Sequence, residues 1–261
     1  MPDPEEVQSS RRRWCLGALA AVGMSGCAPV LPGLPKGSDP ATARVVPFSA
    51  SRRLGDVPEG WREQVMRRDL PATRYLSATR DGRTVAHAVA DKSTSGLRCD
   101  VDIDPNTTPW LNWEWRVDDV EREATVARSD SDDSPARVIL GFDGDMSTLT
   151  LRELMFQEQV ELFAGQVLPF AMLMYVWDGQ AAPESVFNYG RSARIRYLVV
   201  ESGPRSTGRW IGYRRNVVDD YRRVFGSEPG RIRSVGVMTN SDDLKTHSEA
   251  WFGDLVFGRR A

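Results

Sequence analysis

The sequence is poor in the residues that usually build metal centres and disulfide frameworks. Its 261 residues include only two histidines and three cysteines, too few for the common zinc sites or a fold held by several disulfides. The 34 basic and 36 acidic side chains leave a net charge of -2, without the basic excess typical of nucleic-acid binding. No run reaches the roughly 18 apolar residues expected of a membrane-spanning helix. Hydrophobic residues nevertheless make up 41% of the chain, enough for a folded core.

The most specific pattern lies in residues 1–26. Arg11, Arg12 and Arg13 precede an apolar run that ends in small residues, and this order predicts a secretory signal peptide. Arg11 and Arg12 resemble the pair recognised in twin-arginine export signals. We therefore expect export, by either the twin-arginine or the general secretory route.

Residues 24–27, Met-Ser-Gly-Cys, resemble a bacterial lipobox. In this interpretation cleavage precedes Cys27, whose acylated thiol holds the protein at a membrane surface. An amphipathic N-terminus with an incidental Cys27 is the alternative. Ala28 and Pro29 lack the aspartate that retains some lipoproteins at the inner membrane. The sequence thus predicts a periplasmic lipoprotein of the bacterial cell envelope and favours the outer membrane.

The remainder of the chain divides into a tether and one domain. Residues 27–43 are rich in proline, glycine and small residues, which predicts an extended tether. No later stretch has this composition, so we expect a single domain over residues 44–258. Its dominant period is two, as in strands with one buried face. Strand-like runs cover residues 73–79, 83–90, 96–103, 111–117, 138–142, 170–177, 195–199, 210–215, 232–238 and 251–257.

Two helices interrupt these strands. Thr150 and Glu153 have the spacing of a capping box before a helix that Gly165 can end. Asn216 can cap a second, shorter helix that ends at Gly226. The expected apolar face of the first helix is Leu151, Leu154, Met155 and Leu162, and that of the second is Val217, Tyr221, Val224 and Phe225. The predicted fold class is mainly β, a jelly-roll-like β-sandwich with two short helices.

Carboxylates are the abundant reactive groups. Glycoside hydrolysis needs two carboxyl groups facing each other across a sugar, roughly 5 to 10 Å apart, and loops could bring Asp143 and Asp178 together in this way. The alternative is that these aspartates stabilise turns. Residues 130–133 lack the glycine and distal glutamate of an EF-hand loop. We therefore predict no metal and no cofactor, with calcium as the alternative for the acidic loops.

Aromatic and nucleophilic residues further limit the kinds of binding and catalysis that the sequence supports. Trp177 and Trp210 stand near glycine-bearing turns and are candidates for a sugar platform, with burial as the alternative. Cys99 lies in a strand-like run and is expected to be a buried hydrophobe. Neither histidine completes a Ser-His-Asp pattern, and no phosphate-binding glycine loop joins a strand to a helix. Serine hydrolase chemistry and nucleotide binding are therefore not expected.

Several motifs occur in an order that is similar to that of a known bacterial family. They lie at residues 113–115, 130–133, 136–143, 168–170, 175–177, 200–203, 210, 215–217, 220–221, 225–226, 237–239, 242 and 252–254. Over residues 48–257 this order resembles the bacterial domain-of-unknown-function family 3047. The resemblance implies no activity and no catalytic residue, because none is established for the family. One departure is Asn240, where the family pattern more often has aspartate, so a cation site there would lose one charge.

The C-terminal part, residues 237–257, is similar to the closing hairpin of carbohydrate-binding jelly rolls, a likeness of fold alone. The leading hypothesis is a lipid-anchored envelope protein whose sandwich binds a glycan or another polar envelope ligand. The residues expected on the binding face are Trp177, Asp178, Asp118, Asp143 and Arg215. The alternatives are a carboxylate-dependent glycan-active enzyme and a structural or assembly lipoprotein that acts through protein contacts. The expected partners are a membrane and an envelope component, not nucleic acid.

Overall fold

The computed structural model describes residues 44–259. The predicted signal peptide over residues 1–26, the lipidation of Cys27 and the tether over residues 27–43 lie outside the described residues. Within the described part, no helix combines the length and apolar character needed to cross a membrane.

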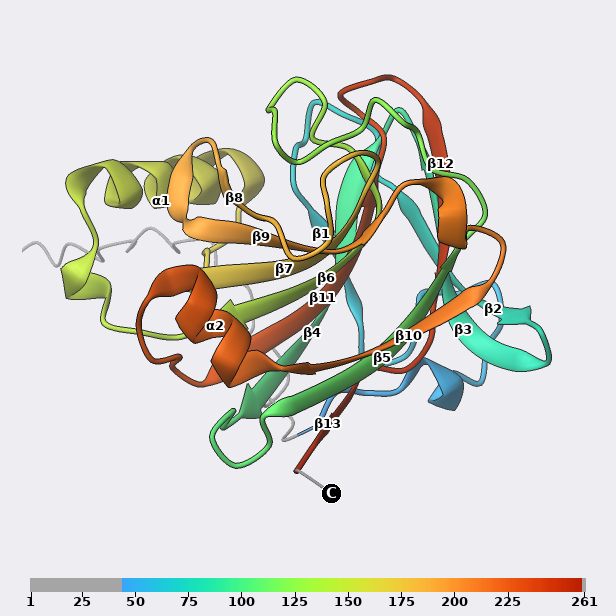
Figure 1. Ribbon diagram of the computed structural model, residues 1–261, viewed down its shortest axis with the longest axis horizontal. Coiled ribbons are helices and arrows are strands. Elements are labelled where there is room, and N and C mark those ends of the chain that lie inside the picture. The colour runs from blue at the N-terminus through green and yellow to red at the C-terminus, as the bar shows by residue number, and fades with distance from the viewer. Residues whose placement is uncertain (1–43, 260–261) are drawn as a thin grey trace, which may run out of the picture. The chain divides into compact units, whose positions relative to one another are not determined.

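Two β-sheets form the body of the molecule (Figure 1). The larger sheet contains, in spatial order, β1 (Arg62–Val65), β4 (Thr94–Ile103), β11 (Ile232–Asn240), β6 (Ser134–Phe142), β7 (Ala171–Asp178), β9 (Ser192–Ser202) and β8 (Val186–Tyr189). The smaller sheet contains β10 (Trp210–Asn216), β5 (Trp110–Val117), β12 (His247–Phe252), β3 (Arg83–Asp91) and β2 (Arg74–Arg80), with β13 (Val256–Gly258) paired to β5. All described strand pairs are antiparallel except β7 with β9.

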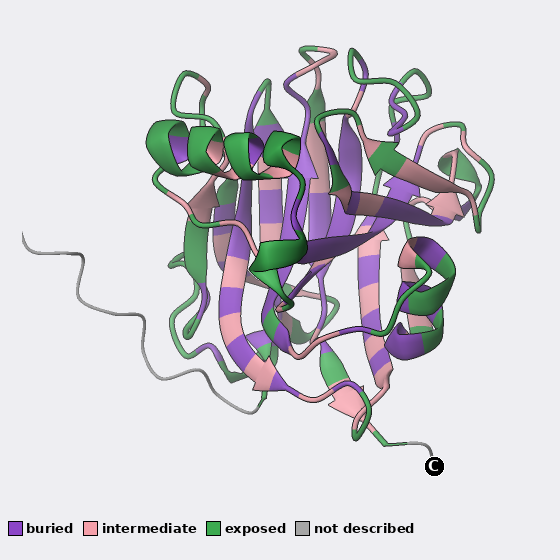
Figure 2. Cartoon of the chain, turned by 90° about the vertical axis from the view of Figure 1, so that its left-hand side faces the viewer, coloured by how far each residue is buried: buried purple, intermediate pink, exposed green. Residues whose placement is uncertain are grey.

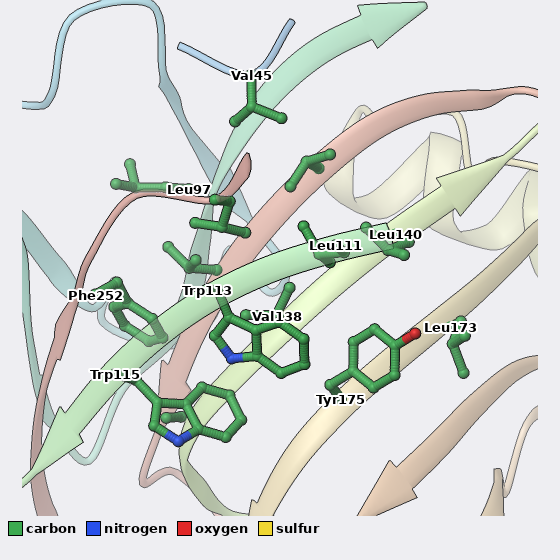
Figure 3. Close-up of a cluster of buried hydrophobic side chains, with 14 of the residues drawn as sticks. Val45, Leu97, Leu111, Trp113, Trp115, Val138, Leu140, Leu173, Tyr175 and Phe252 are labelled. Atoms are coloured by element: carbon green, nitrogen blue, oxygen red, sulfur yellow. The ribbon is translucent and has the colours of Figure 1, made fainter. Parts of the chain in front are cut away.

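The main core lies between the two sheets, where alternate residues of each strand meet. The ring of Trp113 on β5 stacks on Tyr175 of β7 with centroids 5.0 Å apart, and Trp115 lies 6.2 Å from Trp177. Figure 3 shows Trp113 and Trp115 pointing toward the strand that carries Tyr175. The predicted jelly-roll-like β-sandwich is confirmed.

The turns explain two local features of the smaller sheet. Asp81 and Gly82 join β2 to β3 with φ values of 51° and 75°, the positive angles that a two-residue hairpin turn requires. The run 251–257 was expected as one strand but is split, because β12 ends at Phe252 and β13 begins at Val256. The short strands β1 and β8 have too few alternating residues for a clear pattern and were not expected.

Both predicted helices are present with their predicted ends. The longer helix, α1 (Leu151–Ala164), begins with a capping box between Thr150 and Glu153 and ends at the left-handed Gly165. The shorter helix, α2 (Val217–Phe225), is capped by Asn216 and buries Val217, Tyr221 and Val224 as expected. Three single-turn helices are η1 (Phe48–Ala50), η2 (Met146–Thr148) and η3 (Pro204–Ser206).

The predicted apolar face of α1, however, does not pack on the sandwich. Phe156 and Ala164 are the buried residues of α1, and Phe156 joins a second apolar cluster with Met172, Met174 and Ile195. The four residues expected to share the packed face are exposed by 39% to 75%, namely Leu151, Leu154, Met155 and Leu162. Figure 2 shows α1 largely exposed. The helix packs through the other of its two apolar faces.

Candidate functional site

The five residues expected on the binding face do not come together. Trp177 and Asp178, at the end of β7, both have an exposed fraction of 0%. The indole of Trp177 donates a hydrogen bond to the carbonyl of Gly203 at 3.1 Å. The carboxylate of Asp178 accepts hydrogen bonds from the backbone amides of Val126 (2.8 Å) and Ala181 (2.7 Å). These two side chains hold loops together and present no surface to a ligand.

Asp143 and Asp178 cannot act as a facing pair. Asp143 follows Phe142, which pairs with Ala171 at the start of β7, whereas Asp178 is the last residue of β7. Seven residues of strand separate the two ends by about 23 Å, well beyond the separation that glycoside hydrolysis uses. Asp143 instead accepts a hydrogen bond from the backbone amide of Arg231 and pairs with Arg233 at 2.8 Å.

Asp118 and Arg215 lie toward opposite ends of β5. Asp118 follows the last residue of β5, whereas Arg215 pairs with Leu111 near its start. The guanidinium of Arg215 binds the carboxylates of Asp220 and Glu184, both at 2.6 Å. Of the five expected residues, Asp118 alone belongs to the network that surrounds the groove described next.

A groove of about 650 Å³ runs along the outer face of the smaller sheet. Asn112 and Glu114 point into it because they alternate with the core residues Trp113 and Trp115 along β5. The groove is lined by Ser49, Arg83, Thr84, Val85, Asn112, Trp113, Glu114, Gly212, Tyr213, Arg214, Gly253, Asp254 and Val256. Its volume falls within the range of small-molecule binding sites.

Two glycines make room for Glu114 at the floor of this groove. Gly212 pairs with Glu114 across β10 and β5, and an added Cβ there would find no atom nearer than 3.9 Å. On the other side, the amide of Gly253 donates to the carbonyl of Glu114 at 2.9 Å. A Cβ on Gly253 would lie 2.6 Å from Cγ of Glu114. The break between β12 and β13 therefore provides space for the Glu114 side chain.

Two half-buried tryptophans flank Glu114 along the same outer face. Trp110 precedes Glu114 on β5, and Trp210 lies at the other end of the paired strand β10. The guanidinium of Arg214 lies 4.5 Å from the ring centroid of Trp110, and that of Arg83 lies 4.4 Å from Trp210. Such cation–π contacts hold both partners in fixed positions. The groove is thus lined by guanidinium, amide and carboxylate groups, and these two aromatic rings lie beside it.

A charged network continues from the groove across the sheet. The indole of Trp210 donates a hydrogen bond to Asp81 at 2.7 Å. This bond, together with nearby arginines, lowers the pKa of Asp81. Arg116 pairs with Asp81 at 3.3 Å and with Asp118 at 2.8 Å. Asp118 also binds Arg80, whose guanidinium lies over the ring of Trp251.

Two carboxylates, Glu114 and Asp254, line the groove, and both bind protein partners. Glu114 forms an ion pair with Arg83. Asp254 accepts hydrogen bonds from the backbone amide and the hydroxyl of Ser49, at 2.9 and 2.6 Å. These contacts favour roles in shaping the groove and in accepting hydrogen bonds from a ligand.

A separate acidic group lies at the end of β11. Ligand oxygens of Asp133, Asp242 and Asp243 lie within 4.8 Å of one another, and among the described residues this group could hold a metal ion. Burial and the two neighbouring carboxylates raise the pKa of Asp243 to about 6. Asp133 already accepts hydrogen bonds from the amides of Asp243 and Leu244, and Asn240 donates to Asp133 and Asp242. These hydrogen bonds give the aspartates a structural role, which is to hold the turn after β11 together.

The groove residues of β5 lie on the face opposite the tryptophans that pack in the core. The alternation that places Trp113 and Trp115 in the core also places Trp110, Asn112 and Glu114 on the opposite face. The sequence alone therefore predicts which residues of β5 face outward. It does not predict the contributions of Gly212 and Gly253, because these depend on which distant strands pair with β5.

The fold and the groove together define a β-sandwich protein with a charged groove on one sheet and two tryptophans beside that groove. The family described as "Protein of unknown function (DUF3047)" matches residues 59–256. The chain belongs to this family, as its motifs indicated. No curated protein matches the chain.

Similar solved structures are sandwich proteins of low sequence identity. Endoglucanase 3 of family GH12 from Trichoderma harzianum is 9% identical, with a TM-score of 0.39 over 85% of this chain and 96% of that one. A putative glycoside hydrolase from Bacteroides thetaiotaomicron is 8% identical, with a TM-score of 0.40 over 85% and 73%. The K3 cleaved adhesin domain of Lys-gingipain from Porphyromonas gingivalis is 11% identical, with a TM-score of 0.37 over 83% and 99%. Likeness at this level says nothing about what this chain binds.

Proposed function

We propose that this chain is a lipid-anchored protein of the bacterial cell envelope that binds a glycan in the groove of its smaller sheet. The observation that carries the proposal is the groove itself, which holds Glu114 and has Trp110 and Trp210 beside it on the same face of the sheet. A sugar ring presents an apolar face of C–H groups and an edge of hydroxyls. The partly exposed indoles beside the groove suit the face, whereas the carboxylate, amide and guanidinium groups that line it suit the hydroxyls.

The proposed anchor rests on the sequence. The order of arginines, apolar run and lipobox over residues 11–27 is the pattern of an exported lipoprotein. Export places the domain among envelope glycans. The outer membrane is the proposed location, because Ala28 and Pro29 lack the inner-membrane retention signal.

Glycan binding is tested with a variant that fills the groove without removing a contact. Gly212→Val adds an isopropyl group to its open floor, at a strand position where valine is well tolerated. An array of neutral and acidic oligosaccharides identifies the tightest-binding sugar, which is then titrated into the wild type and the variant. We expect Gly212→Val to weaken binding about tenfold or more, equivalent to about 1.4 kcal/mol.

The matched control is Gly190→Val in the turn between β8 and β9, where an added Cβ meets no atom within 4 Å. It should bind like the wild type. Equal affinity of Gly212→Val and the wild type, or no binding of any sugar, would refute the proposal.

A glycan-active enzyme is the second candidate, favoured by the presence of Glu114 and Asp254 in one groove. The two functions separate in the variant Glu114→Gln. An enzyme that uses this carboxylate would lose turnover of the bound sugar while retaining part of its affinity. A binding protein would show no turnover in either form.

A further inference from the structure

Exposed apolar side chains of the described chain concentrate in one segment. Ten large hydrophobic side chains are exposed, and seven of them lie between residues 146 and 167. These seven, which we call the α1 surface, are Met146, Leu151, Leu154, Met155, Leu162, Phe163 and Val167. Single exposed hydrophobic residues are ordinary, whereas a concentration of them marks an interaction site.

The geometry of α1 shows that the leucines of this surface face away from the sandwich. Phe156, Val160 and Ala164 recur every four residues, and Phe156 and Val160 belong to the apolar cluster on the larger sheet. Leu151 and Leu162 are exposed by 73% and 75% and lie on the opposite side of the helix. The packed face already attaches α1 to the larger sheet, so the exposed leucines are not needed to hold the helix in place.

We propose that the α1 surface docks on a lipid bilayer, an inference that rests on the lipid anchor in the proposed function. The sequence has 16 residues between Cys27 and Arg44, and these span at most about 60 Å when fully extended. A domain tied to the bilayer at Cys27 therefore stays within reach of it. At such a high local concentration even a weakly apolar surface becomes occupied.

The charges on α1 indicate which lipid it meets. Glu158 and Glu161 are exposed on the helix, and neither forms an ion pair among residues 44–259. Arg152 on the helix donates a hydrogen bond to the carbonyl of Gly190, and Arg191 beside the helix donates one to Gln159. The helix itself carries more acid than base, so repulsion from anionic headgroups disfavours a strongly negative surface. The proposed occupant is a bilayer of zwitterionic lipid.

The test places a reporter on the α1 surface of the mature lipoprotein. In that form Cys27 is acylated and Cys99 is buried, so an introduced cysteine is the one accessible thiol. Leu162→Cys carries a fluorophore, and the protein is reconstituted in phosphatidylcholine–phosphatidylethanolamine vesicles that contain nitroxide-labelled acyl chains. We expect the label at position 162 to be quenched at least twofold more than a label at Leu54→Cys. Leu54 is a matched exposed leucine that lies beside β2 of the other sheet.

Other results would overturn the docking. Equal quenching at positions 54 and 162 would show that α1 does not touch lipid. Excimer emission between labels at position 162 without quenching would assign the surface to a second copy of the chain. Mass spectrometry of Cys27 before labelling separates this test from the anchor: an acylated Cys27 without quenching refutes the docking alone, whereas an unmodified Cys27 refutes the anchor.

Discussion

Glycine at positions 212 and 253 leaves room on both sides of the Glu114 side chain, which would otherwise be enclosed by its neighbours on a sheet. The indoles of Trp110 and Trp210 lie further along the same face, each under a guanidinium. Because cation–π contacts fix these groups before a ligand arrives, binding costs less side-chain entropy. The side chains in and beside the groove are thus preorganised for a ligand.

Asp243 gives a residue-scale prediction of pH dependence. Its folded-state pKa is raised to about 6, above the ordinary value of about 3.9 in an unfolded chain. Stability linked to this group is therefore fully present below about pH 4 and is lost as the pH rises through 6. Asp243→Asn removes the charge, so we expect it to stabilise the fold by about 1 kcal/mol at pH 8, allowing for solvent screening. At pH 4 we expect no difference.

Urea unfolding of both proteins at the two pH values measures this effect. Asp130→Asn is the control, because Asp130 is 82% exposed, and its effect should not vary in the same way. A stability difference that is the same at pH 4 and pH 8 for Asp243→Asn would contradict the assignment.

Individual residues also show which burial states the sequence predicts and which it does not. The burial of Trp113, Trp115 and Cys99 followed from alternation and is confirmed. Asp178 and Gly179 follow Trp177, and because glycine indicates a turn at the surface, they predict an exposed ring that could serve as a sugar platform. In the structure that turn folds back on the backbone of residues 121–124, with Gly179 closest to it. Coverage by a distant loop leaves no local signal in the sequence.

Among the elements, α1 shows what local sequence can and cannot determine. Its start and end follow from Thr150, Glu153 and Gly165, which act within one turn. Its orientation depends on the surface beneath it, and α1 has apolar residues on both faces. The larger apolar set predicts the packed face, whereas the sheet packs against the smaller set around Phe156.

The two faces of α1 predict opposite responses to truncation. Phe156→Ala removes a buried ring from the second apolar cluster and should destabilise the fold by about 3 kcal/mol. Leu162→Ala removes an exposed side chain and should change stability by no more than about 0.5 kcal/mol. Thermal and urea unfolding measure both variants. A large loss of stability with Leu162→Ala would show that the helix packs through the face that was first expected.

Across the whole molecule, the groove combines residues that are distant in the sequence. Arg83, Asn112, Glu114, Gly212 and Asp254 come from β3, β5, β10 and the break before β13. Strand periods predicted the β-sandwich class and most of its strands. Strand order follows from long-range pairing, such as β5 with both β10 and β12, which periodicity does not encode. For this reason the class of fold was predictable and the position of the groove was not.

The most direct test locates the bound glycan by NMR. The chain has eight tryptophans, whose indole N–H signals are assigned by single Trp→Phe substitutions. During titration with the tightest-binding sugar of the array, we expect the signals of Trp110 and Trp210 to shift, while those of the buried Trp115 and Trp177 stay in place. Unchanged signals of Trp110 and Trp210, with binding shifts elsewhere in the molecule, would contradict the groove as the binding site.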